Sequence, residues 1–338
     1  VHLHAQVQQT FISNIRAVIN QEAKKAGKSE LVPQLVLTSH SSHILDAVSF
    51  EKVRYFRRCR CEGEDATVKT LNASVVLSLK DFKPEKASAD GEPEDAADTL
   101  NFLRKYLRLT HCDLFFADAA ILVEGSAEKL LMPTMIEKAS PTLSQRYLTT
   151  LEVGGAHASK FASLFEFLGI PYLVITDIDT VDPKAKRKAC RADFAGAVTS
   201  NASLRFFLGK LQVADLIALP AKDQIPASQM CYVAYQRPTP TPGYSGGATM
   251  HGRTFEEAFI YENLVLFREG KLLIDEQIPD GDKFEEVYKF VFEHVRSDSF
   301  KKTDFALDVA SSAESWQVPT YIADGLKWLE SLLSPAKA

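Results

Sequence analysis

Residues 119–139 read AAILVEGSAEKLLMPTMIEKA. The first five form an apolar run with the length and bulk of a buried strand, and apolar residues at helical spacing follow after Glu124-Gly125-Ser126. A carboxylate at the carboxyl end of a buried strand, just before a turn into a helix, occupies the place where open α/β sheets carry their chemistry. The stretch therefore predicts a strand, a turn that bears Glu124, and a helix that starts at Glu128.

A second strand with acids at its end follows at residues 171–179, PYLVITDID. Side chains two positions apart on a strand share a face, so Asp177 and Asp179 can reach the same ion. Between the two acidic strands, residues 147–153 read as another strand and residues 159–168 as a helix. This strand–helix alternation predicts an α/β fold with right-handed parallel crossovers.

Size and composition place few limits on function. The chain has 338 residues, of which 46% are hydrophobic and 25% charged, as in ordinary globular proteins, and its net charge is −5. No apolar run approaches the roughly 18 residues of a membrane helix, and the first residues lack the plan of a secretory signal. Five scattered cysteines favour a reducing compartment. We therefore expect a cytoplasmic protein without a membrane partner.

Two groups of motifs carry a family resemblance. LVEGxxE followed by a strand that ends in DxD resembles the Toprim domain of topoisomerases, primases and certain nucleases. FFADAAILVEGSAEKLLMP, with VGGAHASKF after it, resembles the bacterial OLD (overcoming lysogenization defect) family of ATPase-linked nucleases. The resemblance implies a Rossmann-like parallel sheet flanked by helices, and by analogy a role in phage defence.

The acids of these motifs predict a metal site. Hard oxygen ligands favour Mg²⁺ or Mn²⁺, and acids that converge would repel one another without cations among them. GRTFEEAF resembles the family segment that supplies a further carboxylate, and adjacent helical residues point about 100° apart, so one of Glu256 and Glu257 should face the ions. The alternative is that these acids only solvate strand ends or favour a helix N-terminus. The predicted ligands of two ions are Glu124, Glu128, Asp177, Asp179 and Glu256 or Glu257.

Basic residues suggest how DNA would be held. KKTDFAL resembles the late lysine motif of the family, which makes Lys302, or else Lys301, the cation that stabilises charge on the phosphate. Glu124 would bind metal or relay a proton, and Asp177 would bind metal. A basic run after the second strand could contact the DNA backbone, although most such runs are solvated loops. Its members are Lys184, Lys186, Arg187, Lys188 and Arg191.

The first 60 residues resemble the tail of an ABC-type ATPase domain. Leu35-Val36-Leu37 reads as a strand, and in the family the THS sequence at its end places a histidine, here His40, near the nucleotide γ-phosphate. No GxxxxGK[ST] loop occurs in the sequence. We therefore expect this chain to be part of a longer protein. Only that longer protein would use ATP, and a homodimer could form through its ATPase portion.

These observations predict a domain plan and a function. Residues 1–82 would be the ATPase remnant, 83–112 a linker and connecting helix, 113–265 the Toprim domain with room for a helical insertion at 183–230, and 266–338 a C-terminal helical part that completes the site. The function would be a metal-dependent DNA endonuclease. A topoisomerase or primase would use the same acids, and a non-catalytic DNA-binding module of an ATPase would bind without cleavage.

Overall fold

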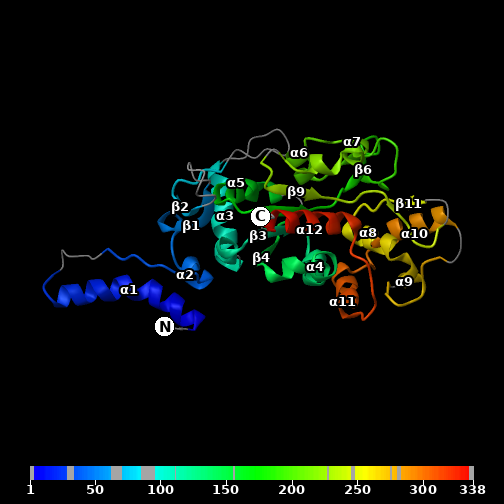
Figure 1. Ribbon diagram of the computed structural model, residues 1–338. Coiled ribbons are helices and arrows are strands. Elements are labelled where there is room, and N and C mark those ends of the chain that lie inside the picture. Colours follow the sequence, from blue (N-terminus) through cyan, green and yellow to red (C-terminus); the bar gives the residue numbers. More distant parts are fainter. Residues whose placement is uncertain are drawn as a thin grey trace. The chain divides into compact units, whose positions relative to one another are not determined.

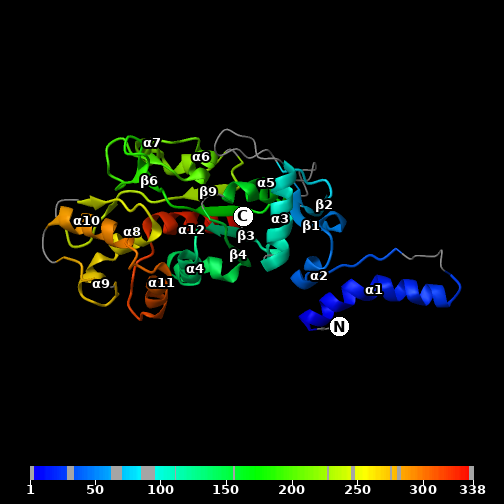
Figure 2. The ribbon, with the colours of Figure 1, turned by 180° about the vertical axis from the view of Figure 1, so that it is seen from behind.

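The computed structural model describes residues 4–28, 34–61, 71–84, 96–110, 112–154, 157–226, 228–244, 248–274, 276–279 and 283–334. These residues divide into two compact units, and along the described chain the change falls between Ala117 and Asp118. Figures 1 and 2 show the helices and strands from two sides. Within these ranges, no helix has the length and apolar character needed to cross a membrane.

The first unit is built around an antiparallel strand pair, β1 and β2, with Arg54 opposite Ser78. Phe50 and Tyr55 pack on Phe115, with ring centroids 6.4 and 6.3 Å apart, and Leu103 and Leu107 are buried on the helix that precedes Phe115 in the chain. The elements of this unit are α1 (Ala5–Lys25), α2 (Ser42–Asp46), η1 (Phe50–Lys52), β1 (Arg54–Cys61), β2 (Leu71–Ser78), α3 (Ala96–Thr110) and η2 (Cys112–Phe116).

One predicted strand of this unit does not form. Leu35-Val36-Leu37 has no strand partner among the described residues, and Val36 is 75% exposed. A strand needs a neighbour to accept and donate its backbone hydrogen bonds. His40 follows this segment in an exposed, irregular stretch, so it does not lie at a strand end as the sequence suggested.

The second unit contains a four-stranded parallel sheet in the order β4-β3-β5-β9, which confirms the predicted α/β class. The chain leaves β3 (Ala119–Val123) through α4 (Ser126–Ala139) and η3 (Pro141–Gln145) to β4 (Leu148–Glu152) on one side. It then passes through α5 (Ala158–Leu168) to β5 (Tyr172–Ile175) on the other side of β3. The direction of winding thus reverses between β3 and β5, where open sheets form a crevice at the carboxyl ends of their strands.

Helices cover both faces of this sheet. Tyr172 of β5 stacks on Phe165 of α5, with ring centroids 4.8 Å apart, whereas the next residue, Leu173, lies against Gly325 of α12 (Thr320–Leu333). Neighbouring residues of a strand point to opposite faces, so α5 and α12 lie on opposite sides of the sheet. Figure 1 shows α12 running along the strands.

The segment after β5 is an insertion before the last strand, β9 (Cys231–Ala234). Its first half is a small antiparallel sheet in the order β7-β6-β8, and its second half is helical. Residues 183–230, where the sequence left room for a helical insertion, therefore contain the strands β7 and β8 as well as helices. Its elements are β6 (Thr180–Asp182), β7 (Lys188–Ala189), β8 (Val198–Thr199), α6 (Ala202–Leu208), α7 (Val213–Ala218) and η4 (Ala221–Gln224).

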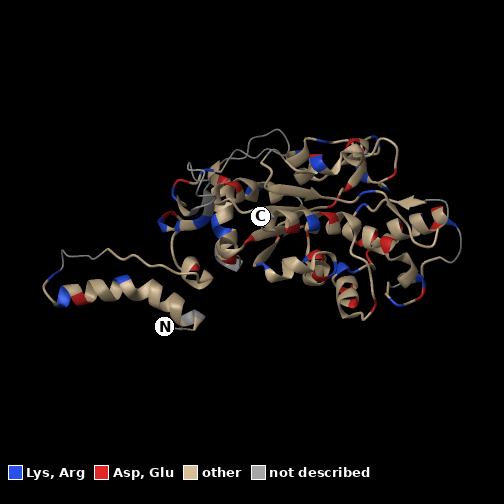
Figure 3. Ribbon diagram, in the orientation of Figure 1, with Lys and Arg blue, Asp and Glu red and all other residues tan. Residues whose placement is uncertain are grey.

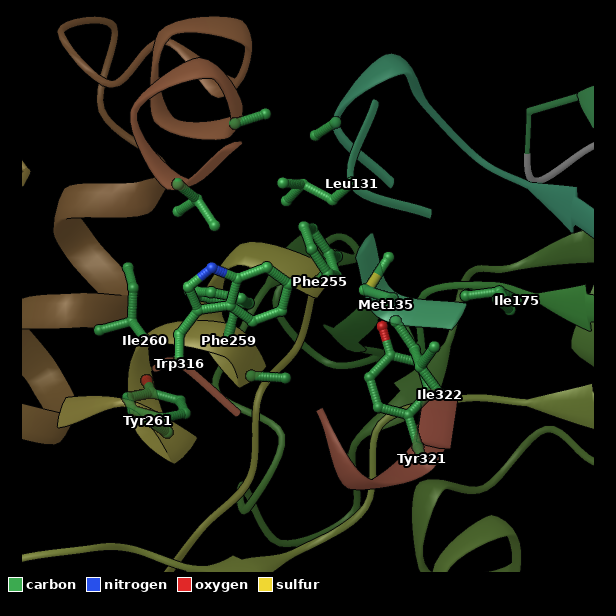
Figure 4. Close-up of a cluster of buried hydrophobic side chains, with 14 of the residues drawn as sticks. Leu131, Met135, Ile175, Phe255, Phe259, Ile260, Tyr261, Trp316, Tyr321 and Ile322 are labelled. Atoms are coloured by element: carbon green, nitrogen blue, oxygen red, sulfur yellow. The ribbon is translucent and has the colours of Figure 1, made fainter. Parts of the chain in front are cut away.

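The C-terminal helices build a large apolar core against α4 and the sheet. Phe259 packs on Trp316 with ring centroids 5.3 Å apart, and Figure 4 shows both with Phe255, Leu131 and Met135. This core places α11 beside α4 and α8 beside α10. The elements after β9 are β10 (Thr239–Pro240), β11 (Thr249–Met250), α8 (Phe255–Glu262), α9 (Leu264–Arg268), α10 (Phe284–Val295) and α11 (Lys302–Ser311).

A glycine sets the position of α8. A methyl group at Gly252 would lie 2.6 Å from the backbone nitrogen and 2.8 Å from the Cα atom of Ala258. Because a helix backbone cannot yield locally, we expect Gly252→Ala to lower the free energy of unfolding by about 1–3 kcal/mol, measured by urea titration. Gly325→Ala is the comparison, since its methyl would meet the end of the Leu173 side chain and the helix gains about 1 kcal/mol of propensity. A Gly252→Ala protein no less stable than Gly325→Ala would contradict this expectation.

Candidate metal centre

Glu124 follows β3 directly, and only one of its two carboxylate oxygens is held by the described residues. Its Oε1 accepts hydrogen bonds from the Thr176 hydroxyl, from the Asp177 backbone N–H at 3.0 Å and from Asn201 Nδ2 at 2.6 Å. Burial raises the pKa of Glu124, the Thr176 hydrogen bond opposes the rise, and the charge of Asp179 adds to it. The strand end thus holds a carboxylate in a defined orientation.

Asp177 follows β5, the strand beside β3, and is buried. Its Oδ1 accepts from Gln236 Nε2 at 2.6 Å and from the Phe255 backbone N–H at 2.9 Å. The hydrogen bond from Phe255 ties the end of β5 to the N-terminus of α8, a position that favours a negative charge. The two acids predicted at strand ends therefore stand at the carboxyl ends of β3 and β5, between which the winding reverses.

The surroundings of Asp177 show which acids are neighbours. Burial raises its pKa well above the ordinary value, and the charges of Glu124, Glu128, Asp179 and Glu256 add to the rise, in that order. Burial also raises the pKa of Glu128 to about 7, with further contributions from Glu256 and Glu124. Acids far apart in the sequence thus act on one another across a single buried region.

Glu256 rather than Glu257 faces this acid cluster. Lys302 Nζ lies 3.0 Å from Glu256 Oε1, and Glu256 is almost completely buried at 1% exposure. Glu257 instead accepts a hydrogen bond from the Arg253 backbone N–H at 2.9 Å, and burial raises its pKa to about 8. Both acids begin α8, and the helical rotation between them separates their directions.

Lys302, rather than Lys301, is the lysine at the cluster. Burial lowers its pKa, but the charges of Glu256 and Asp177 outweigh that effect and raise it above the ordinary value. Lys301 is exposed and donates to the backbone oxygen of Asp298 at 2.5 Å. The first turn of α11 therefore supplies one cation to the buried acids.

Asp179 has a different partner from the other acids. Its Oδ1 lies 2.7 Å from Arg253 NH2, and its backbone has a φ of 48°, a left-handed conformation uncommon for residues other than glycine. Arg253 Nε also donates to the Thr180 backbone oxygen at 3.1 Å. Asp179 thus lies near the other acids, but its carboxylate forms an ion pair with Arg253.

The donor set suits a hard divalent cation in chemistry and charge. Glu124 Oε2 and Asp177 Oδ2 accept no hydrogen bond from the described residues, and burial raises the pKa values of Glu124, Glu128 and Asp177. As they stand, however, no three His, Cys, Asp or Glu side chains in the described part of the chain group closely enough to hold an ion. Binding would therefore require the acids to approach one another further.

Three residues of the site were not singled out from the sequence. Asn201 precedes α6 and caps it, a signal that sequence rules can detect, whereas its bond to Glu124 is a tertiary contact. Gln236 lies shortly after β9, and a polar residue at the carboxyl end of a parallel strand is a general signal of this kind. Arg253 belongs to the GRTFEEAF segment, of which only the acids Glu256 and Glu257 were predicted to reach the site.

The basic run after the DxD motif contains four exposed side chains and one that forms ion pairs. Lys184, Lys186, Arg187 and Lys188 are exposed in the turn and strand that follow β6. Arg191 instead binds Asp193 at 2.5 Å and Glu285 at 2.8 Å. Figure 3 shows basic and acidic residues interspersed through the second unit.

A buried histidine that is hydrogen-bonded to the backbone of Gln236 gives a prediction for the pH dependence of stability. His251 Nε2 donates to the Gln236 backbone oxygen at 2.9 Å, Nδ1 has no partner among the described residues, and burial lowers the pKa to about 4. The unfolded chain binds a proton near pH 6.5 and the folded one only near pH 4, so stability from this group falls as pH drops through that window. We expect the wild-type advantage over His251→Gln to shrink by about 2–3 kcal/mol between about pH 7 and pH 4.5, measured by urea unfolding. A difference independent of pH would contradict it.

Comparison with known proteins supports the recognition made from the motifs. Residues 115–179 match the family model "Overcoming lysogenization defect protein-like, TOPRIM domain". The endonuclease GajA of Bacillus cereus strain HuB5-5 is 27% identical over 350 aligned residues, which cover 98% of this chain and 47% of that protein. The endonuclease GajA of strain VD045 is 25% identical over 103 residues, or 30% of this chain and 18% of that protein. The chain thus spans about half the length, or less, of the curated relatives it matches.

Solved structures of similar proteins include two C-terminal regions of OLD proteins. That of Burkholderia pseudomallei is 19% identical, with a TM-score of 0.36, and the match covers 65% of this chain and 100% of that one. That of Xanthomonas campestris pv. campestris is 18% identical, with a TM-score of 0.36, and covers 65% and 95%. Residues 115–179 thus match the OLD-like Toprim family model, and they contain both of the acidic motifs that carried the resemblance.

Proposed function

We propose that this chain is the nuclease portion of a DNA endonuclease that depends on Mg²⁺ or Mn²⁺. The observation that carries the proposal is the burial of several mutually repelling acids at the carboxyl ends of β3 and β5, with only Lys302 and Arg253 as close cations among the described contacts. Such a cluster is stable at neutral pH when cations balance it. The similarity to endonucleases named GajA favours phosphodiester hydrolysis over other uses of these acids.

The residues divide the work between ligation and charge stabilisation. Glu124, Glu128, Asp177 and Glu256 would hold the cations, with Asp179 joining once it leaves Arg253. Divalent cations, when bound, supply activation of water and stabilisation of the leaving oxygen. Lys302 lies against Glu256 and would stabilise negative charge on the transferring phosphate. Glu257 contributes to the fold of α8 and not to ligation.

DNA would be held by the exposed basic run, and the rest of the protein would couple it to ATP. Lys184, Lys186, Arg187 and Lys188 can contact phosphates without sequence preference, whereas Arg191 is engaged by carboxylates. Residues 1–82 would be the remnant of an ATPase domain and 83–112 the connection, followed by the Toprim domain at 113–265 and the completing helices at 266–338. In the longer protein, dimerisation would occur through the ATPase portion in the cytoplasm.

The test is the product formed from supercoiled plasmid with the chain and Mg²⁺ or Mn²⁺, beside an Asp179→Ala variant. We expect relaxed circles or linear DNA with the wild type, with nicks that only added ligase seals, and far less product with Asp179→Ala. Closed topoisomers would instead indicate a topoisomerase. Plasmid that is bound and shifted in a gel but never cut would indicate a non-catalytic DNA-binding module.

A further inference from the structure

Two amide side chains from separate segments donate hydrogen bonds to the two strand-end acids in the same way. Asn201 Nδ2 donates to Glu124 Oε1 at 2.6 Å, and Gln236 Nε2 donates to Asp177 Oδ1 at 2.6 Å. In each case a backbone N–H, of Asp177 or of Phe255, donates to the same oxygen. The second oxygen of each acid accepts nothing from the described residues, so each carboxylate is bound on one side only.

The two amides are themselves held on their other side. Asn201 Oδ1 accepts from the backbone N–H groups of Ser203 and Leu204 at 2.9 and 3.2 Å. Gln236 Oε1 accepts from the Ile178 backbone N–H at 2.7 Å. Because a backbone N–H must face an oxygen, these contacts also settle which end of each amide points to the acid.

Further contacts leave the amides little freedom to turn. Asn201 Nδ2 also donates to the Thr176 hydroxyl oxygen at 2.9 Å, and Gln236 Nε2 also donates to the Tyr321 hydroxyl oxygen at 3.1 Å. Asn201 is 4% exposed and Gln236 is fully buried. Each amide therefore presents its N–H group to one carboxylate oxygen in a fixed direction.

A carboxylate held in this way can offer only its remaining oxygen to a ligand. Partners of this kind orient metal ligands, and their loss commonly costs about 10–100-fold in metal affinity or activity. We propose that Asn201 and Gln236 are a matched pair of positioning residues, which turn Glu124 Oε2 and Asp177 Oδ2 toward a divalent cation shared by the two strand ends. This inference rests on the proposed function, because it concerns the same site.

Neutral substitutions test the pair without adding charge. Asn201→Ser retains a side chain that can cap α6 but is too short to reach Glu124, and Gln236→Met keeps the length of the side chain but has no donor. Matched controls are Asn263→Ser and Gln224→Met. Both parent residues are buried, and their amides bond to Gln317 and to the Tyr232 hydroxyl rather than to the acids.

The measurements are Mn²⁺ binding to the whole chain by calorimetry, the melting temperature, and the Mn²⁺ concentration that half-activates plasmid cleavage. We expect Asn201→Ser and Gln236→Met to raise the dissociation constant for Mn²⁺ and the half-activating concentration by about 10–100-fold. The controls should lower the melting temperature but leave both constants within about twofold of wild type. A purely structural role for the amides would make all variants behave like the controls, and that result would overturn the inference.

The outcomes separate this inference from the proposed function. If the wild type binds Mn²⁺ and cleaves DNA, and both amide variants bind Mn²⁺ with the wild-type affinity, only the inference about the amides is overturned. If the wild-type chain never cuts DNA but the amide variants bind Mn²⁺ more weakly than it does, the inference is supported and the proposed nuclease function is wrong. A wild-type chain that binds no Mn²⁺ would contradict both the positioning role of the amides and the proposed function. If Gln236→Met does not fold, Tyr321→Phe frees one hydrogen of the Gln236 amide and should raise the Mn²⁺ dissociation constant a few-fold, and an unchanged constant would again overturn the inference.

Discussion

Replacing Asp177 by asparagine is expected to lower plasmid cleavage and, without divalent cations, to raise stability. Asparagine keeps the oxygen that accepts from Gln236 and Phe255 but loses the charge that would bind a cation. A metal ion contributes several kcal/mol to such reactions, which at about 1.36 kcal/mol per decade corresponds to about 10³-fold in rate. The measurement is the initial rate of nicking at saturating Mg²⁺ or Mn²⁺.

The gain in stability follows from the direction of the pKa shift. Burial and the neighbouring acids raise the pKa of Asp177 in the folded protein, so the stability from its protonated form is lost as pH rises through that value. The wild type should therefore become less stable relative to Asp177→Asn as the pH rises toward neutral. Each kcal/mol recovered by Asp177→Asn raises the melting temperature by about 2–4 °C.

Divalent cations should reverse the order of stability, so that the wild type becomes more stable than Asp177→Asn. This reversal is the control for the stability prediction. Saturation at about 100 times the dissociation constant stabilises a binding protein by about 2.7 kcal/mol, and this gain should appear in the wild type and be much smaller in Asp177→Asn. Asp308→Asn, at an exposed position of α11, should match the wild type in rate and melting. An Asp177→Asn protein that cuts DNA normally would show that this acid lies outside the reaction.

The second large effect is expected for Lys302→Met. Removing the cation leaves Glu256 buried beside other acids, and loss of a group that stabilises transition-state charge typically costs about 10²–10³-fold in kcat. The Lys302 side chain is 55% exposed, so solvent screens part of the pair and the cost in stability should be only about 1–2 kcal/mol. Nicking rates and urea unfolding measure the two effects.

Lys301→Met provides a matched comparison at the adjacent position. Lys301 is exposed and contacts only the backbone oxygen of Asp298 among the hydrogen bonds described, so its loss should change the nicking rate less than about twofold. If both lysine variants lose activity equally, the positive charge of the α11 start matters as a whole and Lys302 has no special role.

Local patterns determined much of the fold. The runs at residues 119–123 and 172–175 are strands because apolar residues of that length can be buried on both faces of a sheet, and their acids follow where the apolar pattern stops. The helices at 284–295 and 320–333 follow the spacing of their apolar residues. The sequence at 35–37 has the same apolar character, but with no partner strand among the described residues it does not pair, because backbone hydrogen bonding depends on a neighbour and not on composition.

The sequence by itself thus determined the strands at 119–123 and 172–175, the helices at 284–295 and 320–333, and the acids that follow the two strands. Only the tertiary structure decided between Glu256 and Glu257 and between Lys302 and Lys301, because packing of α8 and α11 sets which side of each helix faces the buried acids. It alone also brought Asn201, Gln236 and Arg253 to the acids. The physical reason is that periodicity is a property of neighbouring residues, whereas a hydrogen bond between distant segments exists only once the chain has folded around its core.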